Sequence, residues 1–234
     1  SYGQVGNANL GGRRFAYLST ITDDYETLNM YKWGLDSSYG LTGMAEGEFA
    51  VQDLTWEIVN KMNLGVELGF LNGMIDLQLD YFDERRKDIF MPRESVPMTA
   101  GFMKQPWKNF GKVTNQGVEV SLNVNKQFGK DLFVSLMGTF TYAHNEITEK
   151  DEPSAVVGTN RAETGHPVGQ LTGYIAEGLF TADDFEDVST GKLKEGIPTQ
   201  SFVGKLRPGD IRYRDVNGDG KVDVFDKSPI GGTK

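Results

Sequence analysis

One stretch with the pattern of a hairpin constrains the fold more than any other part of this chain. Apolar residues alternate with polar residues or glycine along LGVELGF (64–70), and the alternation resumes along IDLQLDY (75–81). Side chains of a β-strand point to opposite faces in turn, so each segment predicts a strand with one apolar face. Asn72 and Gly73, between the two segments, are the residues that a two-residue hairpin turn needs at positive φ.

A second hairpin is predicted from 118–124 and 132–142, with a turn around 127–131. Phe133 and Met137 break its alternation, because they fall on the nominally polar face. The two hairpins together predict antiparallel neighbours with one common apolar face. The residues expected on it are Leu64, Val66, Leu68, Phe70, Ile75, Leu77, Leu79, Val118, Val120, Leu122, Val134 and Leu136.

Composition supports an all-β fold and limits the functions. Glycine makes up 29 of 234 residues, well above the roughly 7% of average usage. The net charge of -9 argues against nucleic acid as a partner, and the absence of cysteine excludes disulfides and thiolate sites. No run of about 18 apolar residues predicts a transmembrane helix, but transmembrane strands need only about 9 to 11 alternating residues.

Short turns alternate with long irregular segments along the sequence. The segments expected to lack regular structure are 91–115, 149–171 and 180–207. Barrels of the outer membrane have short turns at one end and long loops at the other, whereas a soluble sandwich has no such requirement.

An acidic stretch near the C-terminus has the spacing of a calcium-binding loop. Counting from Asp215, oxygen donors fall at loop positions one, three, five, nine and twelve, and Gly220 stands at position six, where such a loop turns sharply. Position seven contributes only its backbone carbonyl. The predicted ligands of one calcium ion are Asp215, Asn217, Asp219, Lys221 through its carbonyl, Asp223 and Asp226.

Two features separate this loop, residues 207–231, from a helix-loop-helix calcium sensor. Position twelve is Asp226, where glutamate is usual, so the ligand has a shorter reach. Prolines and glycines at 208–209 and 228–232 leave no room for flanking helices, which predicts a structural role. Asp, Asn and Gly also form turns without metal, so a metal-free turn is the alternative.

Few residues suggest catalysis or ligand binding. His144 and His166 are not spaced as in metal-dependent proteases, and no nucleophile-elbow motif is present, so no catalytic residue is predicted. Trp107 and Tyr174 fall in predicted loops, where an aromatic ring could stack on a sugar ring. Packing within their own loops is the alternative for both.

Several short phrases follow one another in order along the chain. They are SYGQVGN (1–7), LTWE (54–57), DYFD (80–83), NFGKVTNQGVE (109–119), GHPVG (165–169), GY (173–174) and the stretch 208–226. In this order and at these intervals they resemble the SusC/RagA family of TonB-dependent outer-membrane transporters. The resemblance covers essentially the whole chain and rests on the ordered set, since no single phrase is specific.

The resemblance implies that residues 1–234 form an arc of a large outer-membrane β-barrel of about 22 strands, with the plug, the signal peptide and the C-terminal strands absent from this sequence. It implies import of oligosaccharides or peptides. It further implies a SusD-like surface lipoprotein as partner and lid, and contact with TonB through the missing N-terminal region.

A soluble carbohydrate-binding β-sandwich with a structural calcium ion is the alternative that the residues leave open. Strands of period two suit both folds. A sandwich packs its apolar face against a second sheet, whereas a membrane barrel turns that face to lipid and its polar face to an aqueous lumen. The surroundings of the apolar face therefore distinguish the two.

Overall fold

The structure is a computed structural model that describes residues 1–8, 10–22, 31–33, 35, 39–41, 44–102 and 104–231. The chain divides into two compact units, unit 1 (Ser1–Pro153) and unit 2 (Ser154–Lys234). Helices in the described ranges are single 3-10 turns, and none of them has the length and apolar character needed to cross a membrane.

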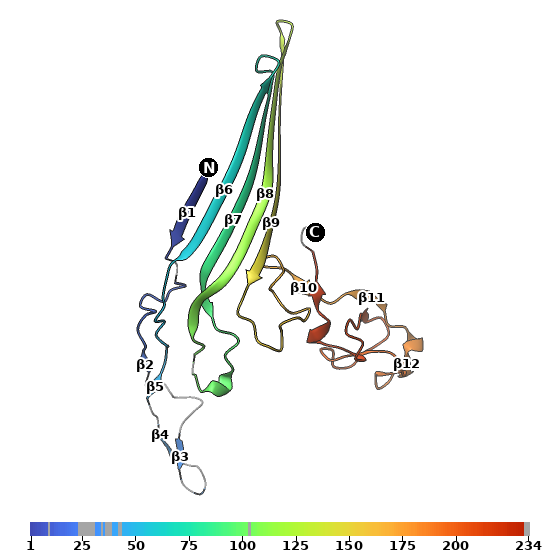
Figure 1. Ribbon diagram of the computed structural model, residues 1–234. Coiled ribbons are helices and arrows are strands. Elements are labelled where there is room, and N and C mark those ends of the chain that lie inside the picture. Colours follow the sequence, from blue (N-terminus) through green and yellow to red (C-terminus); the bar gives the residue numbers. More distant parts are fainter. Residues whose placement is uncertain are drawn as a thin grey trace. The chain divides into compact units, whose positions relative to one another are not determined.

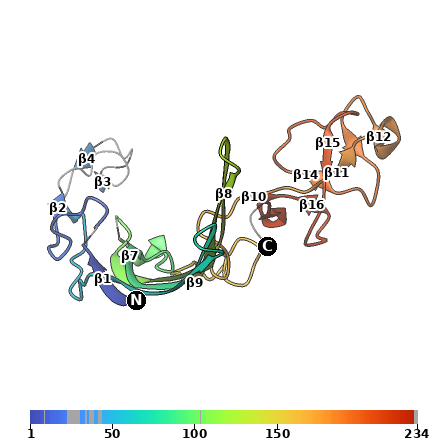
Figure 2. The same ribbon diagram turned by 90° about the horizontal axis from the view of Figure 1, so that it is seen from above.

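Unit 1 is built on one antiparallel sheet of five strands in the order β1-β6-β7-β8-β9 (Figure 1). Its strands are β1 (Tyr2–Asn7), β6 (Glu57–Phe70), β7 (Ile75–Pro92), β8 (Trp107–Phe128) and β9 (Leu132–Glu149). The sheet is twisted and curved, and Figure 2 shows its strands placed along an arc. The antiparallel order follows the chain, because short turns join β6 to β7 and β8 to β9.

The register of the sheet confirms the predicted common apolar face. Leu68 lies opposite Leu77, Leu77 opposite Leu122, and Leu122 opposite Gly138. Since side chains alternate along every strand, this one row fixes the face of all the others. The twelve residues predicted to share a face do share it.

The predicted Asn-Gly turn is also confirmed. Asn72 and Gly73 have φ values of 57° and 80°, and the Met74 N–H donates to the Leu71 carbonyl at 3.3 Å. Positive φ at both central residues matches the right-handed twist of the flanking strands. Leu71 itself has a φ of 55°, which is uncommon for a residue with a branched side chain.

The strands are longer than the alternation predicts. Strand β7 continues to Pro92 and β8 begins at Trp107, so the irregular segment is 93–106 rather than 91–115. Polar residues stand on both faces of these strand ends, so no alternation marks them as strand. Backbone hydrogen bonds hold the ladder there. A register shift between Arg86 and Ile89 interrupts β7 at Asp88, whose φ is 59°.

A buried carboxylate ties together the segments that follow β7 and β9. The Asp151 Oδ2 accepts hydrogen bonds from Arg93 Nε at 2.8 Å and from the Ser95 hydroxyl at 3.0 Å. Burial alone would raise the pKa of Asp151, but these hydrogen bonds and the Arg93 charge hold that pKa below its usual value. The guanidinium of Arg93 also lies 5.5 Å over the Phe110 ring.

The remaining secondary structure is short. In unit 1 it comprises β2 (Ile21–Thr22) with β5 (Ala45–Glu46), β3 (Tyr31–Trp33) with β4 (Tyr39–Leu41), and η1 (Met98–Ala100). In unit 2 it comprises β10 (Thr172–Gly173) with β17 (Ser228–Pro229), β11 (Ala176–Leu179) with β15 (Ile211–Tyr213), β12 (Phe185–Asp187) with β13 (Lys192–Leu193), β14 (Thr199–Gln200) with β16 (Lys221–Val222), η2 (Ala182–Asp184) and η3 (Val224–Asp226).

Unit 2 has a small apolar core and many aspartate-capped turns. Phe180, Phe185 and Leu206 form the core. The Asp184 carboxylate accepts the Thr181 backbone N–H at 2.6 Å and the Thr181 hydroxyl at 2.9 Å. Asp187 accepts hydrogen bonds in the same way from the Ser189 N–H and hydroxyl and from the Thr190 hydroxyl. Such bonds replace the regular ladder that unit 2 largely lacks.

Candidate functional site

Four rows of side chains cross β6, β7, β8 and β9 on one face, which we call the apolar face. The rows are Leu64-Tyr81-Val118-Tyr142, Val66-Leu79-Val120-Phe140, Leu68-Leu77-Leu122-Gly138 and Phe70-Ile75-Val124-Leu136. Many of these side chains are exposed, with Leu64 at 59%, Phe140 at 60% and Leu136 at 62%. The apolar face therefore has no cover from the described part of unit 1.

Aromatic rings mark both ends of the apolar face. Tyr81 and Tyr142 lie in the row nearest the long connections, and Phe70 and Phe128 lie toward the short turns. Tyrosine suits a boundary between an apolar and an aqueous phase, because one end of its ring is apolar and the other carries a hydroxyl.

The opposite face of the same strands, which we call the polar face, is acidic. Asp80 lies directly opposite Glu119, and Glu67 lies opposite Gln78. The Gln78 amide donates to Asp80 Oδ2 at 2.8 Å. In the described rows that back the apolar face, this side carries no lysine or arginine. Like charges placed opposite one another require water around them, so the polar face is a hydrated surface.

A shallow hollow lies on the polar face. It has a volume of about 370 Å³, and its polar lining comes from Glu67, Asp76, Gln78, Ser121 and Asn123. These side chains offer both hydrogen-bond donors and acceptors. The hollow is suited to polar, neutral or cationic groups rather than to anions.

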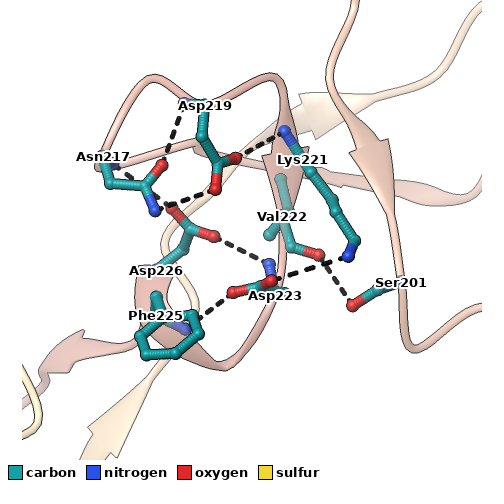
Figure 3. A network of polar contacts seen from close by, with 8 residues as sticks. All are labelled: Ser201, Asn217, Asp219, Lys221, Val222, Asp223, Phe225 and Asp226. Atoms are coloured by element: carbon teal, nitrogen blue, oxygen red, sulfur yellow. Dashed lines mark hydrogen bonds and ion pairs between the residues drawn. The ribbon is translucent and has the colours of Figure 1, made fainter. Parts of the chain in front are cut away.

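Asp226 is the centre of the acidic loop and is fully buried. Its Oδ1 accepts the backbone N–H groups of Val216 and Asn217 at 2.8 and 3.3 Å, and its Oδ2 accepts that of Asp223 at 2.7 Å. Figure 3 shows the carboxylate between the two arms of the loop. Asp226 thus closes the loop, and with Asp223 it forms the capping arrangement of η3.

The other predicted calcium ligands also accept backbone N–H groups. Asp215 accepts those of Gly218 and Gly220, both at 2.7 Å, and Asp219 accepts that of Lys221 at 2.9 Å. These are turn-forming bonds of the kind that Asp makes without a metal. Within the described ranges, no group of three or more Asp, Glu or His side chains is placed to hold a metal ion.

The hydrogen bonds to backbone N–H groups do not themselves exclude calcium, because each carboxylate oxygen keeps a further lone pair. The donor set contains the hard oxygen ligands that calcium prefers, but the carboxylates are not gathered around one point in this structure. Calcium at residues 215–226 therefore stays a prediction.

Trp107 is the first residue of β8 and not a loop residue as the sequence suggested. Its ring centroid lies 5.1 Å from that of Phe90, and the Arg13 guanidinium lies 4.5 Å over the ring. These contacts anchor the segment around Arg13 to the sheet. Stacking of Trp107 on a ligand stays a prediction.

Tyr174 lies in an aromatic cluster that sequence reasoning missed. Its ring stacks on Phe202 with centroids 4.5 Å apart, and Tyr213 lies 5.5 Å away. Lys227 Nζ is 5.5 Å from the ring centroid of Tyr174. Burial raises the pKa of Tyr174, and the carboxylates of the acidic loop add to the effect. Phe202 is 45% exposed and is the open side of the cluster.

Curated relatives match the chain along nearly its whole length. The chain is 23% identical over 244 residues to TonB-dependent receptor P3 of Formosa agariphila, with 99% of this chain and 22% of that protein covered. It is 28% identical over 240 residues to TonB-dependent receptor SusC of Bacteroides thetaiotaomicron, with 97% of this chain and 21% of SusC covered. The chain thus spans about a fifth of the length of these relatives.

Solved structures share the fold. The RagAB peptide importer in the closed-closed state matches with a TM-score of 0.59 and 20% identity, covering 98% of this chain and 22% of that one. The family model described as TonB dependent receptor-like, beta-barrel matches residues 1–228. Because this match takes in both units and every long strand, the chain belongs to the TonB-dependent receptor-like β-barrel family.

Proposed function

We propose that the chain forms part of the wall and extracellular loops of an outer-membrane transporter. The observation that carries the proposal is the apolar face, which spans four long strands and remains exposed. A soluble β-sandwich would bury such a face against a second sheet, so the sandwich alternative is not favoured. A membrane barrel leaves it to lipid and turns the hydrated polar face to the lumen.

The height of the apolar face fits a bilayer. Ten residue steps separate Tyr142 from Leu132 along β9. At about 3.4 Å per residue this is ~34 Å along the strand, and a tilt of about 40° reduces it to ~26 Å across the membrane. Barrels of the outer membrane carry an apolar band of about 25 Å.

The connections set the orientation. Links 71–74 and 129–131 are short, whereas 93–106 and the segment after Glu149 are long. Short turns of outer-membrane barrels face the periplasm and long loops face outside. Tyr81 and Tyr142 then mark the outer boundary of the lipid, and the long segment after Glu149 begins on the extracellular side.

The relatives support a proposal for the cargo class. SusC is named as a TonB-dependent receptor, and RagAB is described as a peptide importer. We propose import of oligosaccharides or peptides, driven through TonB and assisted by a SusD-like lipoprotein that covers the extracellular loops. The acidic polar face suits neutral or cationic cargo. Trp107 and Tyr174 are the aromatic residues proposed to contact it.

A pair of neighbouring arginine substitutions tests the membrane placement. Leu122→Arg puts a charge in a middle row of the apolar face, and Ser121→Arg puts the same charge on the polar face. Arginine at the bilayer midplane costs about 2–4 kcal/mol, so Leu122→Arg is expected to lose that much stability and Ser121→Arg less than about 1 kcal/mol. Urea titration of the full-length protein in lipid vesicles measures both. Equal losses contradict the placement.

Import itself is tested by deleting the gene and supplying single oligosaccharides and peptides as nutrients. Uptake of at least one of them is expected to fall and to return when the gene is restored. Unchanged uptake and growth on every one tested contradicts the transport proposal.

A further inference from the structure

The apolar face changes character just beyond its tyrosine row. The next row toward the long connections is Met62-Asp83-Gln116-His144, and the one after it is Asn60-Arg85-Thr114-Glu146. On β1, Tyr2 lies beside Met62 and Gln4 beside Asn60. We call these two rows the polar belt. They lie on the same side of the sheet as the apolar rows, because each is displaced by an even number of residues.

The height of the polar belt places it at the lipid headgroups. Its rows lie two and four residues past Tyr81. At about 3.4 Å per residue and a tilt of about 40°, these rows stand ~5 and ~10 Å beyond the tyrosines. The headgroup region adds about 5–8 Å to each side of the hydrocarbon core, so the first row lies within it and the Arg85 row lies at its outer edge. The long arginine side chain can reach back into the headgroups from there.

A hollow in the polar belt presents hydrogen-bond donors outward. It has a volume of about 280 Å³ and is lined by Tyr2, Asn60, Met62, Asp83 and Arg85. Arg85 holds both oxygens of Asp83, with Nε to Oδ1 at 3.0 Å and Nη2 to Oδ2 at 3.2 Å. Asp83 is its one partner in the described chain, so three of its five N–H groups remain open.

The other polar groups of the hollow add donors. Gln4 Nε2 donates to Asn60 Oδ1 at 3.0 Å, which occupies the carbonyl of Asn60 and leaves its amide N–H2 for a ligand. Tyr2 is 75% exposed and offers its hydroxyl. Lys87, one row farther along β7 and exposed, adds a positive charge. Arg85 and Lys87 offset the charges of Asp83 and Glu146 in the belt. The open N–H groups of Arg85 and Asn60 and the Tyr2 hydroxyl are donors for an anionic group rich in oxygen, such as a phosphate.

We infer that the polar belt binds the phosphorylated sugar headgroup of an outer-leaflet glycolipid, with Arg85 on the phosphate. The inference rests on the proposed function, because that function places this face in lipid and this end outside. A glycolipid fits better than a phospholipid, because Gln116, Thr114 and His144 extend the belt sideways with groups that can bond sugar hydroxyls. The row of Tyr81 lies below the belt, at the boundary with the acyl chains.

The test compares two single-charge losses at the same height on opposite faces. Arg85→Gln removes a cation from the polar belt, and Lys61→Gln removes one from the polar face, where Lys61 Nζ pairs with Glu84 at 2.7 Å. The full-length protein is placed in phosphatidylethanolamine nanodiscs with trace rough lipopolysaccharide, and co-purified glycolipid is measured by mass spectrometry. Heat-modifiable migration on gels verifies that each variant is folded.

We expect Arg85→Gln to retain about tenfold less glycolipid, as the loss of one charge-assisted phosphate contact predicts, and Lys61→Gln to match the native protein. Equal retention by all three proteins overturns the inference, as does equal binding of dephosphorylated glycolipid. An equal loss of phosphatidylglycerol in a parallel nanodisc overturns the glycolipid assignment. If Leu122→Arg behaves as proposed while Arg85→Gln changes nothing, only this inference fails and the membrane placement stands.

Discussion

Gly117 is the position in the sheet where a single added methyl group is expected to cost most. It is buried in β8 on the polar face. A Cβ there would lie 2.2 Å from the carbonyl oxygen of Tyr142 in β9 and 2.6 Å from Cζ of Phe82 in β7. The Phe82 ring can rotate, but the Tyr142 carbonyl belongs to the sheet backbone. Gly117→Ala therefore forces β8 and β9 apart.

The magnitude follows from the distance. An ordinary contact requires about 1 Å more than 2.2 Å. Overpacking of this kind costs about 1–3 kcal/mol. A shift of that size also weakens the adjacent ladder hydrogen bonds, each worth about 0.5–1.5 kcal/mol. We expect Gly117→Ala to lower the free energy of unfolding by about 3 kcal/mol.

Gly138 in β9 is the matched control, since a Cβ there meets nothing within 4 Å. Gly138→Ala is expected to be neutral or to stabilise by up to about 1 kcal/mol, because alanine loses less backbone freedom on folding. Urea titration of the full-length protein in vesicles, followed by tryptophan fluorescence, measures both variants. Equal effects at the two glycines refute the reasoning. Full recovery by adding Phe82→Ala would show that the ring, and not the carbonyl, sets the cost.

Two further predictions concern aspartate oxygens. We propose that calcium binds residues 215–226, so calorimetry at millimolar calcium is expected to show heat of binding that Asp219→Ala abolishes; no heat with the native protein returns the loop to a metal-free turn. Asp151 has a lowered pKa in the folded state, so it stabilises the protein above its unfolded pKa of about 4, and that contribution is lost as pH falls through the lower folded value. The difference in the free energy of unfolding between the native protein and Asp151→Asn is therefore expected to shrink in acid. A difference that stays constant from pH 7 to about pH 3 contradicts the role given to Arg93 and Ser95.

The sequence predicted the part of the sheet whose two faces have different surroundings. Along 64–81 and 118–142 one face is apolar and the other polar, so the period of two is visible in the residues themselves. Phe133 and Met137 are on the polar face as the alternation indicates, opposite Gln127 and Asn123. The turn at 72–73 was predictable because few residues tolerate positive φ.

The rest depended on partners that no local pattern encodes. Strand β1 has no clear alternation. It forms because its residues pair with the edge of β6, with Val5 opposite Val59. The far ends of β7 and β8 mix polar and apolar residues without alternation, so their length could not be predicted. The aromatic cluster of Tyr174, Phe202 and Tyr213 joins residues far apart in sequence, and no spacing signals it.

The aspartate-capped turns of unit 2 make acid a selective perturbant of this molecule. Hydrogen bonds from Thr181 lower the pKa of Asp184, and those from Ser189 and Thr190 lower that of Asp187. Such turns are stabilised above a pH of about 4 and lose that support as pH falls through the folded pKa values. The main sheet is joined by backbone groups that do not titrate. Acidification to below about pH 4 is thus a way to loosen the loop-rich part while the strands keep their register, which separates the contributions of the two parts without cutting the chain.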